Sequence, residues 1–273
     1  MRVQKLLAGL ILALCLGVEG KSPKTFEGFK VYRAQLASED DVSFIKNLEK
    51  SPFVNFWSDI IPGRHVDVMV DPENQDEMET DFEKHGISYH ILVSDVQARI
   101  ELEKRTAPGG EETHTNHSMT WTDYHNLADI YNFLDYLEAA YDFVSTESIG
   151  KTTEGREMRV AKICKGVCGN KPGVWIDAGI HAREWIAPAA VTWMLNELVE
   201  NDESHPDLTE EYDWYFLPAH NPDGYEFSWD EDRMWRKSRS DYGSEVGCLV
   251  MFNLFKHKHQ ILIKLFSYSR EWI

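Results

Sequence analysis

The sequence is poor in cysteine, in positive charge and in long apolar runs, and each shortage narrows what the protein can be. It has 4 cysteines in 273 residues, and its 28 lysines and arginines stand against 46 aspartates and glutamates. The net charge of −18 argues against nucleic acid and anionic membrane as partners, because both repel an acidic surface. Beyond residue 20 no apolar run approaches the roughly 18 residues of a membrane-spanning helix, so we expect no membrane span.

The longest apolar run lies at the N-terminus. Arg2 and Lys5 precede a 13-residue apolar core over 6–18, and the small residue Gly20 follows it. That core is too short to cross a bilayer and has the length of a secretory signal. We therefore predict that residues 1–20 are a signal peptide and that the protein is secreted to the extracellular space. Export would make Asn116 of Asn-His-Ser a glycosylation acceptor.

The cysteine count limits which crosslinks can form. Cys15 falls within the predicted signal peptide, which leaves three cysteines. Cys164 and Cys168 lie four positions apart, and one interpretation is a small local disulfide formed in the secretory pathway. The alternative is half of a zinc finger, but no second Cys/His pair follows at finger spacing. Cys248 has no partner in either case.

Residues 28–93 show the pattern of a small α+β unit. Strand-like runs over 29–34, 54–57, 66–70 and 87–93 are separated by two helical segments. Ser38 and Asp41 form a capping box before the first helix, and Gly86 closes the second. The order β-α-β-β-α-β is the split ferredoxin-like pattern, which predicts four strands in one sheet with two helices behind it.

A charged helical segment over 95–105 ends this unit. It finishes in Lys104 and Arg105, and Thr-Ala-Pro-Gly-Gly-Glu-Glu follows. A basic pair before a flexible polar segment is typical of a site cut by a trypsin-like protease. An ordinary interdomain linker has the same composition. We place the first domain at 21–105 and a linker at 106–119.

Residues 120–248 alternate between strands and helices. Thr122 is expected to cap an amphipathic helix that runs to Tyr141, and a later helix runs to Val199. Strands are expected over 144–149, 158–163, 174–178 and 212–217. This alternation indicates an α/β domain with a mixed, mostly parallel sheet, whose ligands belong at the carboxyl ends of the strands.

One strand end carries a pair of side chains suited to a metal. In VWIDAGIHAREW, residues 174–185, the strand is broken by Gly179, and His181 and Glu184 follow three positions apart. That spacing places both side chains on one face of a turn, and imidazole and carboxylate are both ligands of zinc. The spacing alone is weak, because His220 and Asp223 share it by chance among 11 histidines and 46 acidic residues.

Two further motifs raise the weight of this pair. HNPDGYEFS at 220–228 is expected to end a strand in a turn, and a basic cluster, RMWRKSRS at 233–240, then interrupts the acidic chain. In order and approximate spacing, GIHAREW, HNPDGY and RMWRKSRS resemble the zinc metallocarboxypeptidases of the pancreatic A/B type. The resemblance runs from about Lys24 to Cys248. Three motifs that agree in order are a far stronger signal than any one of them.

The resemblance implies a domain order. An N-terminal ferredoxin-like α+β activation pro-domain, here 21–105, would cover the active site until a trypsin-like protease cuts near Arg105. Part of an α/β zinc-carboxypeptidase domain with a mixed sheet would follow over 120–248. After that cut, the resemblance implies, the enzyme would hydrolyse the C-terminal peptide bond of a peptide or protein with one zinc-bound water.

The resemblance also implies roles for five residues. His181 and Glu184 would be two of the three zinc ligands. Arg236 would stabilise the oxyanion, a task for which a fixed guanidinium is suited. Arg183 and Arg233 would line the substrate cleft. A solvated basic patch is the alternative interpretation of these arginines.

The last 25 residues, 249–273, depart from the family. They contain no Gly, Pro or Asp, and the histidine that would be the third zinc ligand has no counterpart in them. His257 or His259 is a weak substitute. We therefore expect an incomplete, inactive form of the zymogen with an exposed sheet edge. The alternative is a non-catalytic product whose pro-domain binds and inhibits carboxypeptidases.

Overall fold

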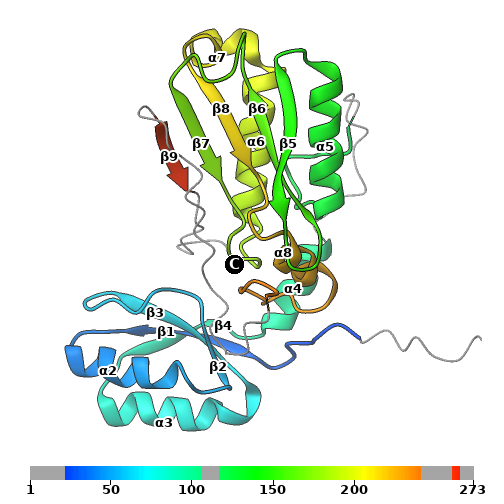
Figure 1. Ribbon diagram of the computed structural model, residues 1–273. Coiled ribbons are helices and arrows are strands. Elements are labelled where there is room, and N and C mark those ends of the chain that lie inside the picture. Colours follow the sequence, from blue (N-terminus) through cyan, green and yellow to red (C-terminus); the bar gives the residue numbers. More distant parts are fainter. Residues whose placement is uncertain (1–21, 106–116, 241–259, 265–273) are drawn as a thin grey trace, which may run out of the picture.

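The computed structural model describes residues 22–105, 117–240 and 260–264, with side chains described for 22–103 and 117–240. The chain forms two regions, each built on its own sheet (Figure 1). We call residues 22–105 the first region, and residues 117–240 with 260–264 the second region. None of the helices in these residues has the length and apolarity of a membrane span.

The first region has one antiparallel sheet with the strand order β2-β3-β1-β4. In chain order its elements are β1 (Lys30–Gln35), α2 (Glu39–Leu48), β2 (Val54–Phe56), β3 (His65–Val70), η1 (Pro72–Asn74), α3 (Gln75–His85), β4 (Tyr89–Val93) and α4 (Val96–Arg105). The helices α2 and α3 lie together on one face of the sheet (Figure 1). The predicted split ferredoxin-like order is therefore confirmed.

Local signals in the sequence set the ends of these helices. The hydroxyl of Ser38 accepts a hydrogen bond from the Asp41 amide at 3.1 Å, and the Asp41 carboxylate accepts one from the Ser38 amide at 2.9 Å, which confirms the capping box. Gly86 ends α3 in the left-handed conformation with φ of 66°. The apolar faces of both helices then bury Ile45, Met78 and Phe82 against the sheet.

The second region has a mixed sheet with the order β5-β6-β8-β7-β9. Its elements are α5 (Leu127–Ala140), β5 (Val144–Lys151), β6 (Glu157–Ile163), β7 (Gly173–Asp177), α6 (Ile186–Glu200), η2 (Asp202–Ser204), α7 (Pro206–Glu211), β8 (Asp213–Leu217), α8 (Pro222–Asp230) and β9 (Gln260–Lys264). The predicted mixed sheet is confirmed, and β5, β7, β8 and β9 run in one direction while β6 runs against them. The β5–β6 hairpin and the β6–β8 pair are antiparallel, whereas β7 is parallel to β8 and β9.

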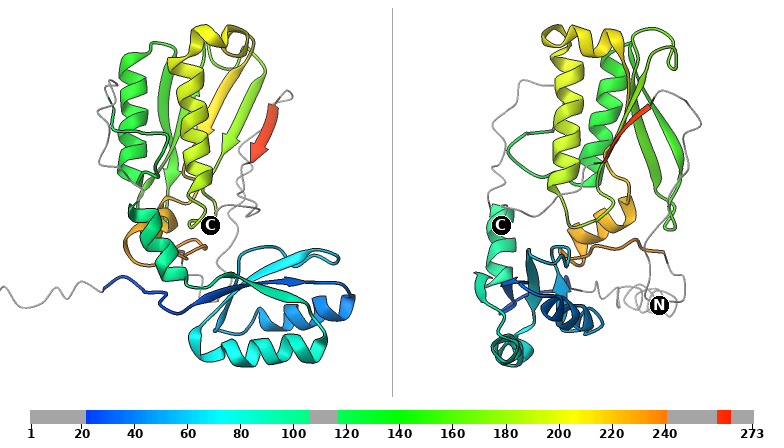
Figure 2. Two further views of the ribbon diagram at one scale, coloured as in Figure 1. Left: turned by 180° about the vertical axis from the view of Figure 1, so that it is seen from behind. Right: turned by 90° about the vertical axis from the view of Figure 1, so that its left-hand side faces the viewer.

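The main core of the second region lies on one face of this sheet. Figure 2 shows α5 and α6 side by side on that face. Their buried side chains, such as Leu134 and Val191, pack against Ile163, Ile176 and Phe216 of the sheet. The opposite face carries a smaller buried cluster, made of Met158, Val160, Trp175 and Leu217. The two faces are therefore covered very unequally.

Two expectations for the second region need correction. Asn126, not Thr122, caps α5, because its side-chain oxygen accepts a hydrogen bond from the Asp129 amide at 2.9 Å. The segment at 220–228 does not form a turn. Pro222 instead begins α8, since a proline suits the first turn of a helix, where its missing N–H is not needed.

The last residues of the chain contribute a strand that was not predicted. β9 pairs with β7 from Gly173–Gln260 to Asp177–Lys264, so the outer strand on that side of the sheet is β9 rather than β7. The chain enters β9 beside Gly173, at the end of β7 that lies away from His181. His257 and His259 themselves, like residues 1–20 and Asn116, lie outside the described residues.

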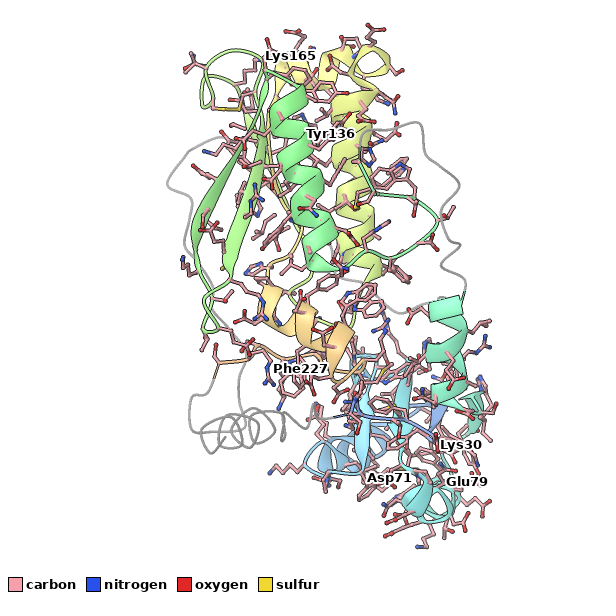
Figure 3. All side chains as sticks on the ribbon, turned by 90° about the vertical axis from the view of Figure 1, so that its right-hand side faces the viewer. Lys30, Asp71, Glu79, Tyr136, Lys165 and Phe227 are labelled. Atoms are coloured by element: carbon pink, nitrogen blue, oxygen red, sulfur yellow. A yellow bond between two sulfur atoms is a disulfide. The ribbon has the colours of Figure 1, made fainter. Side chains whose placement is uncertain are left out.

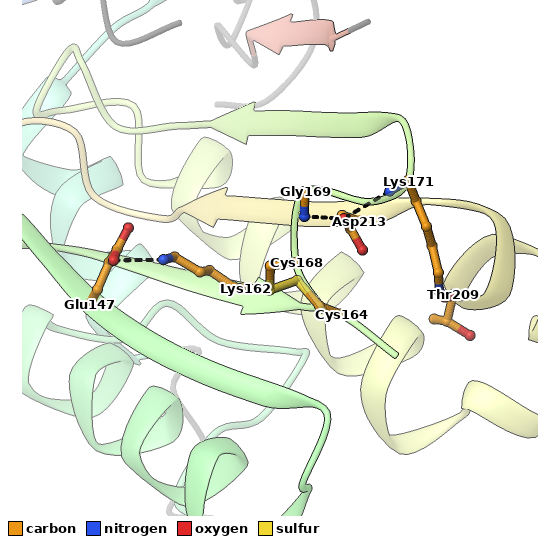
Figure 4. The surroundings of a disulfide bond; sticks show 8 residues. All are labelled: Glu147, Lys162, Cys164, Cys168, Gly169, Lys171, Thr209 and Asp213. Carbon is orange, nitrogen blue, oxygen red and sulfur yellow. Dashed lines mark hydrogen bonds and ion pairs between the residues drawn. A yellow bond between two sulfur atoms is a disulfide. The ribbon is translucent and has the colours of Figure 1, made fainter. Parts of the chain in front are cut away.

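The local disulfide between Cys164 and Cys168 is confirmed (Figure 4). It closes a short loop between β6 and β7. Directly after it, the amide of Gly169 donates to the carboxylate of the fully buried Asp213 on β8 at 2.7 Å. The crosslink thus holds the loop against the amino ends of the parallel strands.

Candidate active site

The loop after β7 is shaped by a glycine that no other residue can replace easily. Gly179 has φ of 72°, and a Cβ there would meet the Pro188 side chain at 3.2 Å and the Pro218 carbonyl at 3.4 Å. Backbone bonds then tie this loop to the one after β8, where the His220 amide donates to Ala178 at 2.8 Å. The carboxyl ends of two neighbouring parallel strands are thereby joined.

His181 and Glu184 face each other at this end of the sheet. The Nδ1 of His181 lies 2.9 Å from the Oε1 of Glu184, and their side chains are 16% and 17% exposed. A backbone bond from the Glu184 amide to the His181 carbonyl at 3.1 Å closes the turn between them. One imidazole nitrogen and one carboxylate oxygen therefore meet at a point that solvent can reach.

These two donors match zinc in kind, and they supply part of a site. Zinc in a hydrolase takes three protein ligands from His, Cys, Asp or Glu. Within residues 22–103 and 117–240, no group of three such side chains lies close enough to hold a metal ion. The part of the chain that the structure describes therefore offers two ligands, and a third must come from elsewhere.

His220 and Asp223, which share the same spacing, do not form a pair. The Nδ1 of His220 lies 3.3 Å from the Asp177 carboxylate, whose other oxygen accepts a hydrogen bond from the Trp175 indole at 2.9 Å. Asp223 instead accepts hydrogen bonds from Thr152 and Arg156 in the β5–β6 hairpin. Its role is to fasten that hairpin to α8.

Arg183 points from the ligand loop into the first region. Its guanidinium donates to the side-chain oxygen of Asn55 at 2.5 Å and to the carbonyl of Phe56 at 2.7 Å, both on β2. Burial, together with the nearby positive charge of Arg236, lowers the pKa of the Arg183 guanidinium to about 10. The positive charge of Arg183, which burial disfavours, is thus stabilised by two hydrogen-bond acceptors of the first region.

Arg233 is held by three contacts. Its guanidinium stacks on the Trp185 ring at 3.6 Å and donates to both oxygens of Glu103 at 2.8 Å each. It also donates to the Arg183 carbonyl at 2.8 Å. Such a bidentate pair is stronger and more directional than an ordinary surface ion pair. A solvated basic patch is therefore the wrong interpretation of Arg183 and Arg233.

The basic segment also carries Arg236 and Arg239. The backbone carbonyl of Arg236 accepts a hydrogen bond from the Ala182 amide at 3.2 Å, so Arg236 lies beside the ligand loop. Arg239 stacks on Phe227, at 3.8 Å, and pairs with Glu154 at 3.1 Å. Figure 3 labels Phe227 on α8, on the side of the second region that faces the first. The sequence-predicted residues thus gather on one end of the second region.

Sequence reasoning missed the partners of these arginines. Glu103 lies in a helix rich in charge, and Asn55 lies in a short strand, so neither has a local signal that marks it. Both contacts join residues more than a hundred positions apart in the chain. The contact between the regions is extended by Met234, which packs against a buried cluster of the first region that includes Phe26 and Ile100.

Known proteins support the domain order and the fold. Residues 32–103 match the carboxypeptidase activation peptide, and residues 130–255 match the zinc carboxypeptidase family. Carboxypeptidase B of Rattus norvegicus is 36% identical over 242 residues, which are 85% of this chain and 56% of the relative. Carboxypeptidase A1 of Bos taurus is 35% identical over 247 residues, which are 87% of this chain and 58% of the relative.

Solved structures of carboxypeptidases resemble this fold. The carboxypeptidase A of Helicoverpa armigera superimposes with a TM-score of 0.71 at 28% identity, over 79% of this chain and 54% of that one. Thrombin-activatable fibrinolysis inhibitor gives a TM-score of 0.67 at 27% identity, over 80% and 56%. The chain belongs to the zinc carboxypeptidase family and carries the activation peptide of that family ahead of its catalytic part. It spans about half the length of the curated relatives that it matches.

Proposed function

We propose that this chain is the activation pro-domain and the first part of the catalytic domain of a secreted zinc metallocarboxypeptidase zymogen. Its substrates would be the C-termini of peptides and proteins, from which the enzyme removes the last residue. One observation carries the proposal. His181 and Glu184 converge within 2.9 Å at the carboxyl end of β7, beside arginines that the first region covers.

The side chains divide the work of hydrolysis between them. His181 and Glu184 would hold the metal. A zinc ion bound there would supply an activated water and polarise the scissile carbonyl. Arg236, beside the ligand loop, would stabilise the negative charge that develops on the carbonyl oxygen. Arg183 and Arg233 would bind the peptide backbone, a role for which their donors are suited once Asn55 and Glu103 leave.

The contacts between the regions support the zymogen state. Both cleft arginines are bound to residues of the first region, so a peptide cannot use them while that region stays in place. Glu103 lies near the end of α4, which finishes at Arg105. A trypsin-like protease that cuts near Arg105 would cut directly behind this contact and allow the first region to leave.

The test of the metal site is a zinc titration of the full chain by calorimetry. We expect His181→Ala and Glu184→Ala each to weaken zinc binding by about tenfold or more, since each removes a ligand. His205→Ala is the matched control, because the side chain of that histidine is 43% exposed and the residue follows α6 along the chain, whereas His181 and Glu184 precede α6. Equal zinc affinity in all four proteins would overturn the assigned ligands.

Because the described residues supply two ligands, we propose that the 273-residue chain does not hydrolyse peptides by itself. Release of a C-terminal residue by the trypsin-treated chain would contradict this. The contacts to Arg183 and Arg233 favour a second candidate function, in which the pro-domain binds and inhibits other carboxypeptidases. The assay is inhibition of an active family member by residues 21–105, and a lack of inhibition would remove this candidate.

A further inference from the structure

Two distant segments of the chain form the candidate active site. Residues 180–184 carry His181 and Glu184, and residues 233–237 carry Arg233 and Arg236. Their direct backbone link is a hydrogen bond from the Ala182 amide to the Arg236 carbonyl at 3.2 Å. The guanidinium of Arg233 adds a hydrogen bond to the Arg183 carbonyl at 2.8 Å, and a side chain from a third segment contacts both loops.

Asn221 joins both segments through one amide group. Its Nδ2 donates to the carbonyl of Ile180 at 3.3 Å and to the carbonyl of Lys237 at 3.0 Å. Ile180 directly precedes His181, and Lys237 directly follows Arg236. The two protons of one amide nitrogen thus hold the carbonyls next to the metal-ligand pair and next to the arginine.

The rest of Asn221 is fixed by α8 and by the loop after β7. Its Oδ1 accepts a hydrogen bond from the Gly224 amide at 3.0 Å, which caps α8. Its own amide donates to the Gly179 carbonyl at 3.1 Å, and its carbonyl accepts from the Tyr225 amide at 2.9 Å. The side chain therefore has no freedom to turn away from its two carbonyl partners.

The fit around this amide is tight. A Cβ on Gly224 would lie 2.4 Å from the Nδ2 of Asn221 and 2.8 Å from the Lys237 carbonyl. A glycine at this position lets the helix, the amide and the basic segment approach one another. The contact is closely packed on the side of α8, and the Lys237 carbonyl lies at the surface.

We propose that Asn221 is a positioning residue, which sets the distance between the His181–Glu184 pair and Arg236. This inference rests on the proposed function, because it gives those three residues their roles. Asn221 does not touch the metal or the peptide. It acts through the carbonyls of Ile180 and Lys237, and its amide donors are what the role requires.

A serine substitution tests the positioning role of Asn221 separately from its role as a helix cap. In Asn221→Ser the hydroxyl still caps α8, because serine is as good a cap as asparagine, but it is too short to hold both carbonyls. Asn126→Ser is the matched control. Asn126 caps α5 in the corresponding way, by accepting from the amide three residues on, that of Asp129, at 2.9 Å, and it lies in a different part of the second region. Asn221→Asp is the second variant, since it also caps and donates nothing.

The first measurement is amide hydrogen exchange in the metal-free full chain. In Asn221→Ser and Asn221→Asp we expect the Ala182 amide to exchange about tenfold faster or more, because the local opening of its bond to Arg236 becomes easier. The Gly224 amide should stay protected. Unchanged exchange at Ala182 in both variants would overturn the proposal, and so would faster exchange throughout the second sheet, which a merely structural role predicts.

The second measurement is Co²⁺ binding, followed by the visible absorption spectrum of the full chain. We expect Asn221→Ser to raise the Co²⁺ dissociation constant by about tenfold, as the loss of residues that orient metal ligands does, whereas Asn126→Ser leaves it unchanged. Equal effects of the two serine variants would overturn the positioning role. If the unmodified chain binds no Co²⁺, the proposed function fails, and the exchange of Ala182 still decides the role of Asn221.

Discussion

The two regions of this protein differ in how the faces and edges of their sheets are covered. The first region pairs four strands in one antiparallel sheet and buries both of its faces, with α2 and α3 on one side and Val96 and Ile100 of α4 on the other. The second region places α5 and α6 on one face and closes the edge at β7 with five residues from the far end of the chain. The first region is complete within about eighty residues, and the second depends on distant ones.

The candidate site residues are distributed unequally between the two regions. The candidate ligands and arginines all lie in the second region. His181, Arg183 and Glu184 follow the carboxyl end of β7, and Arg233 and Arg236 follow α8, where loops must be held by contacts with the rest of the chain. The first region contributes Asn55, Phe56 and Glu103, which occupy the donors of the second. The self-contained region thus acts as the cover, and the dependent region carries the chemistry.

The comparison is tested most strongly by removing one large buried ring from each core. Phe82 and Phe133 are both fully buried, in the first and second region respectively. We expect Phe82→Ala and Phe133→Ala each to lower the unfolding free energy of its own region by about 3–5 kcal/mol, through lost burial and a cavity. Urea unfolding of the full chain, monitored by amide hydrogen exchange in each region, measures both unfolding free energies.

The matched controls are Phe82→Leu and Phe133→Leu, which keep most of the apolar volume and should cost less. If either alanine variant destabilised both regions equally, the regions would form one cooperative unit and the comparison would be wrong.

A smaller effect is expected from the contact that joins the regions. Glu103→Gln removes the charge that binds Arg233, so the affinity between the two pieces produced by cleavage after Arg105 should fall by about 1.5–3 kcal/mol. That loss corresponds to roughly ten- to a hundredfold in the dissociation constant, which calorimetry resolves. Glu77→Gln, at an exposed site on α3, is the control and should leave the affinity unchanged.

Replacing a helix-cap residue should lower the unfolding free energy of its own region by a still smaller amount. Ser38→Ala and Asn126→Ala should each cost about 1 kcal/mol of the unfolding free energy of their own regions, because each leaves amides at a helix start unpaired. Thermal unfolding measures the change. A loss on Thr122→Ala as large as on Asn126→Ala would contradict the cap that the structure assigns to α5.

The smallest predicted effect depends on pH and is confined to the second region. Burial lowers the pKa of the His117 imidazole below its usual value of 6.5, against the opposing charge of Glu200. The unfolded chain therefore binds a proton that the folded chain does not, so stability is fully present above about pH 6.5 and falls as the pH drops below it.

The measurement is urea unfolding of the second region between pH 5 and pH 8. His117→Phe should flatten this pH dependence, since the ring packs against Phe133 and Tyr136 and phenylalanine does not titrate. An unaltered pH dependence in His117→Phe would show that another group is responsible.

The same contrast decides how much of the fold could be predicted. The first region was predicted almost to the residue, because its capping box, its closing glycine and its alternating strands are all local signals. In the second region the strands were found from their apolar runs, but the start of α5, the helix α8 and the strand β9 were not. Their positions are set by contacts with segments far away in the sequence.

The candidate site shows the same limit. His181 and Glu184 were placed together because their spacing on a turn dictates it, and the structure has them 2.9 Å apart. The partners of Arg183 and Arg233, and the bridging role of Asn221, could not be predicted. Each depends on which carbonyl or carboxylate another segment brings within reach, and the residues near each position in the sequence do not predict that partner.

The pairing of β9 with β7 has a consequence for the order in which the chain is made. Synthesis runs from the N-terminus, so the first region can fold while the later residues are still being added. During that time β7 already pairs with β8 on one side, and its other side presents unpaired amides and carbonyls. Bare strand edges of this kind recruit other chains. A nascent chain therefore presents the edge of β7 in the interval between residues 217 and 260, until β9 pairs with it and becomes the outer strand on that side.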